Sequence, residues 1–87
     1  MEKEIINKYF KDGKLTVIPR KESIKLVIFS YLVKELANED EVFLEKEIND
    51  FLKKYYDDYA ILRRYMIDYK FLTRDNYGKN YTINKEK

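Results

Sequence analysis

The stretch that decides the fold is residues 57–83, which read D-D-Y-A-I-L-R-R-Y-M-I-D-Y-K-F-L-T-R-D-N-Y-G-K-N-Y-T-I. Its first half predicts a helix, because an Asp pair at the start can cap free backbone N–H groups and apolar residues follow at helical spacing. These residues are Leu62, Met66 and Tyr69. The second half predicts strands at 71–74 and 80–83, joined by a loop in which Gly78 takes the left-handed conformation. A helix followed directly by a hairpin is the layout of a winged helix-turn-helix.

Two more helices are predicted upstream of this stretch. Residues 21–37 carry a wide apolar stripe, which is typical of a central core helix. From Glu45 onward, apolar residues recur at i, i+3, i+4 and i+7, and acidic residues occupy the first turn, as the helix dipole favours. We expect this to be the first helix of the helix-turn-helix. Between the two helices, residues 42–44 are expected to add a third strand to the hairpin.

The N-terminal part predicts an extension of this core. Residues 2–10 have helical spacing, and we expect Asp12-Gly13 to end that helix, because glycine tolerates the positive φ of a C-cap. Alternating β-branched residues at 14–18 predict a short strand that Pro19 closes.

The predicted fold is therefore α+β and mainly helical, a winged helix-turn-helix with an extra N-terminal helix and short strand. We expect one domain over residues 1–87: an extension at 1–20, a core at 21–83 and a frayed tail at 84–87. A chain of 87 residues is long enough to bury one modest core without metal or disulfide support.

Composition excludes several classes of chemistry. With no Cys and no His, the chain has no disulfide, no Cys or His zinc ligand and no Cys–His or Ser–His nucleophile pair. The acids at 39–41 with Glu45 lack EF-hand spacing, and only two glycines are present, so no phosphate-binding glycine loop exists. We expect no enzyme, no cofactor and no metal. The acidic start and the absence of a long apolar run predict a cytoplasmic protein without a membrane span.

Charge is unevenly distributed, although the net charge is only +2. Residues 35–50 hold seven acids against Lys46 alone, whereas seven bases face four acids from residue 58 onward. Such asymmetry can mark one surface for an anionic partner, and double-stranded DNA is the first candidate. Arg63 and Arg64 would enter the major groove, and three hairpin residues would contact phosphate. The hairpin residues are Arg74, Lys79 and Asn80. Alternatively, both arginines pair with nearby acids, among them Asp58, Asp68 and those of 45–50.

A protein-interaction role is the alternative function. Four tyrosines cluster around the turn between the last two predicted helices: Tyr55, Tyr56, Tyr59 and Tyr65. Tyrosine favours interfaces because its ring is apolar and its tip is polar. The partner would be a second copy of the chain or a regulator protein. The competing interpretation is that these rings are half-buried packing residues at the rim of the core.

Four fragments together resemble a bacterial family known as domain of unknown function 2087. They are Y-F-K-D-G-K-L-T-V-I-P-R-K (9–21), E-I-N-D-F-L (47–52), D-D-Y-A-I-L-R-R-Y-M-I-D-Y (57–69) and F-L-T-R-D-N-Y-G-K-N-Y (71–81). Members occur alone or fused behind transcriptional regulator domains, so the resemblance implies a regulatory association and no defined activity. The chain departs from the pattern at Ile48, where valine is expected, at Leu44, where a small polar cap is usual, and at Lys70, where glycine often precedes the second strand.

Overall fold

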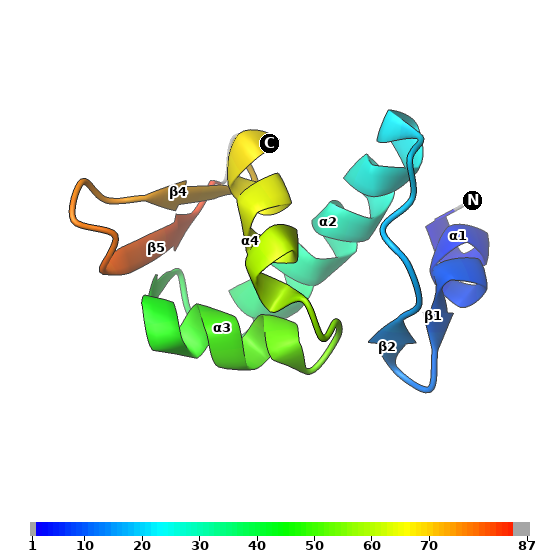
Figure 1. Cartoon of the computed structure of the whole chain (residues 1–87), viewed down its shortest axis with the longest axis horizontal. Helices are drawn as coiled ribbons and strands as arrows, with labels where there is room; N and C mark the ends of the chain where they lie inside the picture. Colours follow the sequence, from blue (N-terminus) through cyan, green and yellow to red (C-terminus); the bar gives the residue numbers. More distant parts are fainter. Residues whose placement is uncertain (1, 85–87) are drawn as a thin grey trace.

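A computed structural model describes residues 2–84 and has helices and short antiparallel sheets, which confirms the α+β class (Figure 1). The elements follow in the order α1 (Glu2–Tyr9), β1 (Phe10–Lys11), β2 (Lys14–Leu15), α2 (Glu22–Ala37), β3 (Val42–Leu44), α3 (Glu45–Lys53), α4 (Tyr59–Asp68), β4 (Leu72–Arg74) and β5 (Asn80–Ile83). The extension formed by α1, β1 and β2 lies at one end of the molecule, and the β4–β5 hairpin lies at the other (Figure 1).

The core forms around α2, as its apolar stripe predicts. Phe29 is fully buried, and its ring contacts Tyr65, Tyr69 and Phe71 at centroid distances of 6.3, 5.7 and 5.9 Å. Because these three residues come from α4 and the segment that follows it, the contacts attach the end of α4 to the central helix. Helices α3 and α4 contribute further buried side chains: Ile48, Phe51, Leu52, Leu62 and Met66.

The second sheet has the strand order β3–β5–β4 and is antiparallel throughout. Tyr81 pairs with Phe43, and Ile83 pairs with Leu72. All four of these side chains are buried, whereas Thr82 points to solvent, so one face of the sheet covers the core. The strands predicted at 42–44 and 80–83 are confirmed, and the one predicted at 71–74 is observed from Leu72 to Arg74.

Helix α3 begins without a polar cap residue. Leu44 stands at the N-cap position, and leucine cannot accept a hydrogen bond from the free N–H groups of the first turn. Glu47 instead reaches back, and its Oε1 accepts from the Leu44 backbone N–H at 2.7 Å. This is one half of a capping box, and it fixes the junction between β3 and α3.

Helix α4 ends in a left-handed turn at Lys70, whose φ is 65°. The Lys70 N–H donates to the Ile67 carbonyl at 3.0 Å, and the Phe71 N–H donates to the Met66 carbonyl at 2.8 Å. This pair of bonds is a Schellman motif, in which glycine is the usual left-handed residue. The turn directs the chain from α4 into β4 at the cost of holding a lysine in an unfavourable conformation.

The N-terminal extension differs from its prediction in two respects. Asp12 and Gly13 both have positive φ, 53° and 81°, and form the turn of a β1–β2 hairpin rather than the end of a helix. The predicted strand at 14–18 is also shorter, since β2 ends at Leu15. Thr16 continues the register of the hairpin by donating its N–H to the Tyr9 carbonyl at 2.9 Å. Leu15 then joins the hairpin to the end of α3 by donating to the Tyr55 carbonyl at 2.7 Å.

Asn84, which the sequence assigned to a frayed tail, is held by two hydrogen bonds. The Asn84 N–H donates to the Phe71 carbonyl at 3.0 Å, and its side-chain amide donates to the Lys70 carbonyl at 2.8 Å. Asn84 therefore extends the pairing of β5 with the start of β4. Residues 85–87 lie outside the described part of the chain.

Candidate nucleic-acid interface on α4

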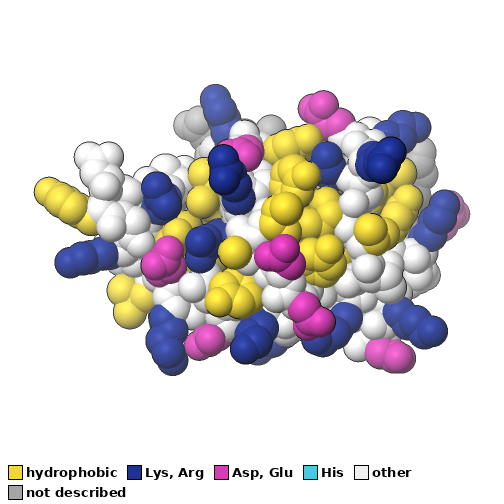
Figure 2. Space-filling view, viewed as in Figure 1, with side chains coloured by type: hydrophobic (Ala, Val, Ile, Leu, Met, Phe, Trp, Pro, Cys, Tyr) yellow, Lys and Arg dark blue, Asp and Glu magenta, His cyan; other side chains and the backbone are white. Residues whose placement is uncertain are grey.

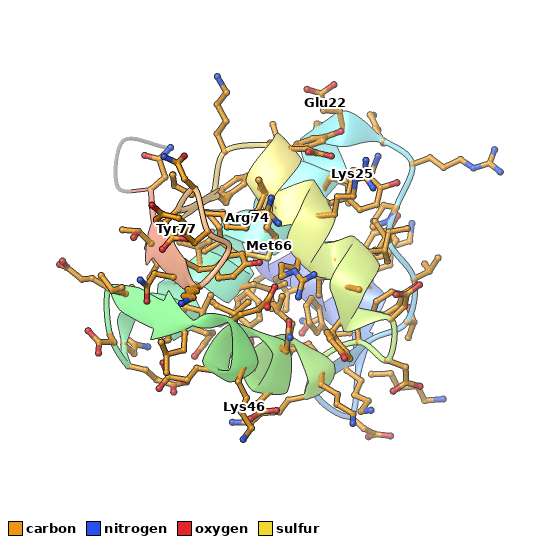
Figure 3. The ribbon with its side chains drawn as sticks, turned by 60° about the vertical axis from the view of Figure 1, so that its left-hand side comes forward. Glu22, Lys25, Lys46, Met66, Arg74 and Tyr77 are labelled. Carbon is orange, nitrogen blue, oxygen red and sulfur yellow. The ribbon has the colours of Figure 1, made fainter. Side chains whose placement is uncertain are left out.

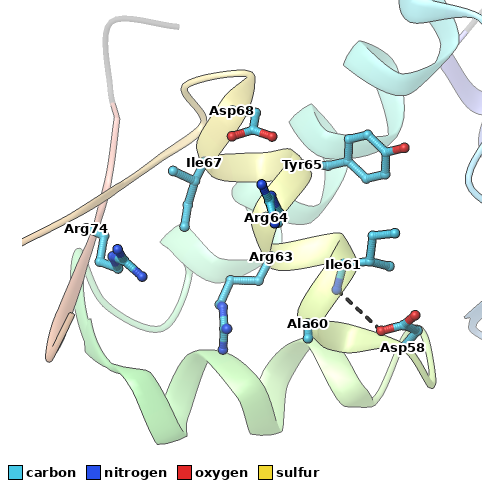
Figure 4. Close-up of a pocket in the computed structure, with 9 residues that line it drawn as sticks. All are labelled: Asp58, Ala60, Ile61, Arg63, Arg64, Tyr65, Ile67, Asp68 and Arg74. Carbon is cyan, nitrogen blue, oxygen red and sulfur yellow. Dashed lines mark hydrogen bonds between the residues drawn. The ribbon is translucent and has the colours of Figure 1, made fainter.

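An open groove of about 880 Å³ runs along the outer side of α4 and reaches the β4–β5 hairpin (Figure 4). Its lining includes three arginines: Arg63, Arg64 and Arg74. Two carboxylates, Asp58 and Asp68, lie in the same lining. The groove thus contains charges of both signs, contributed mainly by one helix.

Arg64 faces solvent because of where the buried residues of α4 stand. Leu62 and Met66 are fully buried, and each lies two residues from Arg64, which at about 100° per residue is nearly the opposite side of the helix. Asp58 starts the helix, since its Oδ1 accepts from the Ile61 N–H at 3.4 Å, as the sequence predicts. The Arg64 side chain lies over the groove (Figure 4), and among residues 2–84 no salt bridge of Arg64 is found.

Arg63 has a different environment from its neighbour. Its side chain is only 21% exposed and turns toward α3, where Nη1 donates to Asn49 Oδ1 and lies 3.6 Å from Glu45 Oε1. Its guanidinium carbon also lies 5.9 Å from the centroid of the Tyr81 ring. The structure therefore separates the two arginines that the sequence placed together, and Arg63 pairs with an acid of the segment 45–50.

Tyr81 completes this cluster from the hairpin side. Its hydroxyl donates to Glu45 Oε1 at 3.0 Å, so the carboxylate joins β5, α3 and α4. Burial, with the hydrogen bond to Glu45, raises the pKa of Tyr81, while Arg63 and Arg74 nearby act in the opposite direction. We call Arg63, Glu45, Asn49 and Tyr81 the Arg63 cluster. The sequence did not reveal it, because a contact across 36 residues leaves no local periodicity.

The loop of the β4–β5 hairpin is built around Asp75. Its Oδ1 accepts from the N–H groups of Tyr77 at 3.1 Å and Lys79 at 2.9 Å, and its Oδ2 accepts from the Asn80 amide at 3.1 Å. These bonds, above all that from Lys79, lower the pKa of Asp75. Gly78 has a φ of 68°, which confirms its predicted turn conformation.

The polar side chains of the hairpin differ in how accessible they are to a ligand. Asn80 uses its amide on Asp75, whereas the Lys79 side chain is exposed. Tyr77, which the sequence did not single out, is 85% exposed at the loop, and Arg74 lies on the same hairpin and lines the groove (Figure 3). Of the three hairpin residues predicted to contact phosphate, Arg74 and Lys79 therefore have the more accessible polar groups.

The four predicted interaction tyrosines lie at the rim of the core. Tyr55 packs against Phe51 at a centroid distance of 5.2 Å and against Phe10 at 6.3 Å. Burial and the nearby Glu35 carboxylate raise the pKa of its hydroxyl. Tyr56, Tyr59 and Tyr65 are also half-buried and packed against the core. Their rings are thus partly used in folding the chain, and they do not form a separate exposed cluster.

Two of the acidic side chains in segment 45–50 form ion pairs with basic side chains. Glu45 belongs to the Arg63 cluster, and Asp50 pairs with Lys46 at 3.5 Å on the outer side of α3. Within residues 2–84 no three acidic side chains gather as a metal-binding group would. In the same range, none of the helices has the length and apolar character to cross a membrane.

A protein-family model matches residues 14–83, and the family is described as an uncharacterized protein conserved in bacteria (DUF2087). The matched range covers β2 to β5 and leaves out α1 and β1. No curated protein and no solved structure matches the chain.

Proposed function

We propose that the core of this chain is a winged helix-turn-helix module that binds double-stranded DNA through α4. The chain belongs to the DUF2087 family of bacterial proteins. In this proposal the module is a non-catalytic, regulator-associated unit. The observation that carries it is the exposed Arg64 in an open groove that the β4–β5 hairpin extends.

The arrangement of the elements supports this proposal. Helices α3 and α4 pack against each other across a short turn, and the hairpin follows α4 directly (Figure 1). The Schellman turn at Lys70 and the Arg63 cluster fix the hairpin against the helix pair. A helix with an exposed arginine and an adjacent hairpin can contact a duplex at two places with little rearrangement.

Chemistry distinguishes the roles of the basic residues. Arg64 has a free guanidinium, whose planar donors suit the O6 and N7 atoms of guanine in the major groove. Arg74 and Lys79 come from the hairpin and suit phosphate, which sets register rather than sequence. Asp75 holds the loop that carries Lys79, so this contact needs little ordering on binding. In this proposal Arg63 does not contact DNA and instead holds α4 against α3 through Glu45 and Asn49.

The acids of the groove constrain how a duplex would lie. Asp58 and Asp68 occupy the groove on α4 and repel phosphate, so the backbone contacts belong on the hairpin side. With few phosphate contacts and a net charge of only +2, we expect modest affinity. The slope of log affinity against log salt should be about −0.9 for each phosphate contacted.

The test is a fluorescence-anisotropy titration of a short mixed-sequence duplex at several salt concentrations. Arg64→Ala should weaken binding by about 5- to 150-fold, the range for loss of one bidentate arginine contact, if the duplex carries its site. If Arg64 contacts phosphate instead, the slope of log affinity against log salt should fall by about one.

The matched control is Arg20→Ala, which removes the same charge from an exposed residue just before α2, outside the groove lining. Its affinity should stay within about twofold of the parent, as expected for a charge without a phosphate contact. If the parent chain does not bind duplex at low salt, or if both variants bind equally, α4 is not a DNA-binding helix.

A further inference from the structure

The outer face of α4 carries a carboxylate beside its exposed arginine. Arg64 and Asp68 are four residues apart, so they lie one above the other on the same side of the helix. Both are exposed, and both line the groove (Figure 4). Met66, which points about 200° away from each of them, is fully buried. The groove therefore offers a partner a hydrogen-bond donor and an acceptor from adjacent turns of one helix.

The Asp68 carboxylate is without a partner in the described part of the chain. Among residues 2–84 it takes part in no salt bridge and no side-chain hydrogen bond, although Arg64 stands one turn before it. Asp68 is also the last residue of α4, where the helix dipole favours basic side chains. A residue that opposes helix stability without a compensating contact is expected mainly at functional sites.

The surface around α4 is a mixture of charges. Basic and acidic side chains are interspersed over it and do not gather by sign (Figure 2). Such a surface has no broad positive field, so hydrogen-bond geometry contributes more than net charge to the choice of a DNA sequence. A carboxylate in this setting rejects phosphate and discriminates among base edges.

The major-groove edges of the bases differ in what they offer a carboxylate. Cytosine presents an N4 amino donor, whereas guanine presents the O6 and N7 acceptors and thymine presents an O4 acceptor. Adenine has an amino donor with the N7 acceptor beside it. Because a carboxylate only accepts hydrogen bonds, cytosine suits it best, and guanine and thymine repel it. An arginine has the reverse preference, since its donors match guanine.

We propose that Asp68 is a specificity-determining residue of α4, whose carboxylate accepts a hydrogen bond from the N4 amino group of a cytosine while Arg64 contacts a nearby guanine. The inference rests on the proposed DNA-binding function and adds to it the bases that the helix selects. The two residues are about 6 Å apart along the helix axis, and stacked base pairs are about 3.4 Å apart. For a helix that lies along the groove, Arg64 and Asp68 therefore reach different base pairs, about two steps apart.

The first experiment is selection of duplexes from a random-sequence pool on the immobilised full chain, followed by sequencing. The parent should enrich duplexes that have a guanine and a cytosine at a fixed spacing. Asp68→Asn should keep the guanine and replace the cytosine with adenine, because an asparagine amide forms two hydrogen bonds with the N6 and N7 atoms of adenine.

Asp58→Asn is the matched control, because it removes the same charge from the other carboxylate of the groove lining. Asp58 caps α4 by accepting from the Ile61 N–H, and asparagine caps a helix about as well as aspartate does. The Asp58→Asn variant should therefore fold and select the same bases as the parent. Any gain in affinity from weaker repulsion of phosphate should be common to both variants, whereas the change of base should occur in Asp68→Asn alone.

The second experiment measures the preference by anisotropy titration of two duplexes. One carries the selected sequence, and the other has an A·T pair in place of the selected C·G pair. The parent should bind the cytosine duplex about 5- to 150-fold more tightly, the range for one mismatched base pair in a recognised site. Asp68→Asn should reverse this preference. Its thermal melt should be no lower than that of the parent, which excludes an effect of misfolding.

The results separate this inference from the proposed function. A parent chain that binds no duplex, or that binds equally well after Arg64→Ala, contradicts both. A parent chain that binds through Arg64 but selects no cytosine, or that keeps its cytosine preference after Asp68→Asn, contradicts this inference alone. The same holds if Asp58→Asn changes the selected base as much as Asp68→Asn does.

Discussion

Two sides of the same helix, those of Arg63 and Arg64, differ more than their positions in the sequence suggest. Arg63 is 21% exposed and bound by Glu45 and Asn49, whereas Arg64 is exposed over an open groove. The difference arises because consecutive residues of a helix point about 100° apart. One of the two directions meets α3 and the hairpin, and the other meets solvent.

This comparison shows how adjacent identical residues acquire different environments. A guanidinium that is hydrogen-bonded by its own protein has few donors left for a ligand, and its removal leaves partly buried acceptors without that partner. A guanidinium in solvent contributes little to folding and keeps its donors for a partner. Removing the first kind of guanidinium should therefore change the stability of the fold, and removing the second should change the affinity for a ligand.

The largest expected effect is on the stability of the Arg63→Ala variant. It should lose about 1–3 kcal/mol of unfolding free energy, because Glu45 and Asn49 lose their partner in a half-buried site. Arg64→Ala should stay within about 0.5 kcal/mol of the parent, as expected for a surface substitution. Urea denaturation followed by circular dichroism measures both. Equal losses in the two variants would remove the distinction between the two sides of α4.

A second prediction tests the Arg63 cluster from the hairpin. Tyr81→Phe removes the hydroxyl that donates to Glu45 and should cost about 1 kcal/mol, whereas Tyr77→Phe, at an 85% exposed position, should cost nothing measurable. The comparison uses the same chemical change at two sites of one hairpin. If Tyr81→Phe is as stable as Tyr77→Phe, the hydrogen bond to Glu45 does not hold the hairpin.

The same residue predicts a pH dependence at the alkaline end. The pKa of Tyr81 is raised by folding, so its contribution to stability is complete below the ordinary tyrosine value of 10.0 and is lost as pH rises through the higher folded value. Tyr81→Phe should therefore lose less stability than the parent between neutral and strongly alkaline pH. Part of the loss should remain, because the pKa of Tyr55 is raised too. Urea midpoints measured at both pH values test this difference.

The smallest expected effect is a gain at the end of α4. Lys70→Gly relieves the left-handed strain of the lysine but increases the freedom of the unfolded chain, so the net gain should be about 0.5–1 kcal/mol. Lys70→Ala is the control, since alanine carries the same strain as lysine and should bring no gain. A thermal melt that ranks alanine above glycine would contradict this account of the turn.

Local patterns predicted most of the fold. The apolar spacing of 21–37 and 57–69 gave the central helix and α4, and alternation around Gly78 gave the hairpin. The N-terminal hairpin was missed because its strands have two residues each, too few to show alternation. Asp12-Gly13 therefore looked like the end of a helix, although both residues occupy a hairpin turn.

The candidate site was less accessible to such patterns. The helical periodicity predicted that both arginines lie away from the buried stripe. This is correct for Arg64, which is exposed, but not for Arg63, which is half-buried. The environment of Arg63 depends on Glu45 and Tyr81, which are distant in the sequence and meet only after the sheet has formed. The alternative prediction, that the arginines pair with acids of residues 45–50, identified the correct segment. The sequence did not show which of the two arginines makes this pair.

We also expect the hydrogen bond from Leu44 to Glu47 to limit pairing of the sheet edge with another chain. Strand β3 lies at an edge of its sheet, and its bonds to β5 use Glu41 and Glu45, so the backbone groups of Val42 and Leu44 point to the open side. An open strand edge can pair with another chain and start a fibril. Because Glu47 already occupies the Leu44 N–H, this edge offers an incoming strand a shorter and interrupted template.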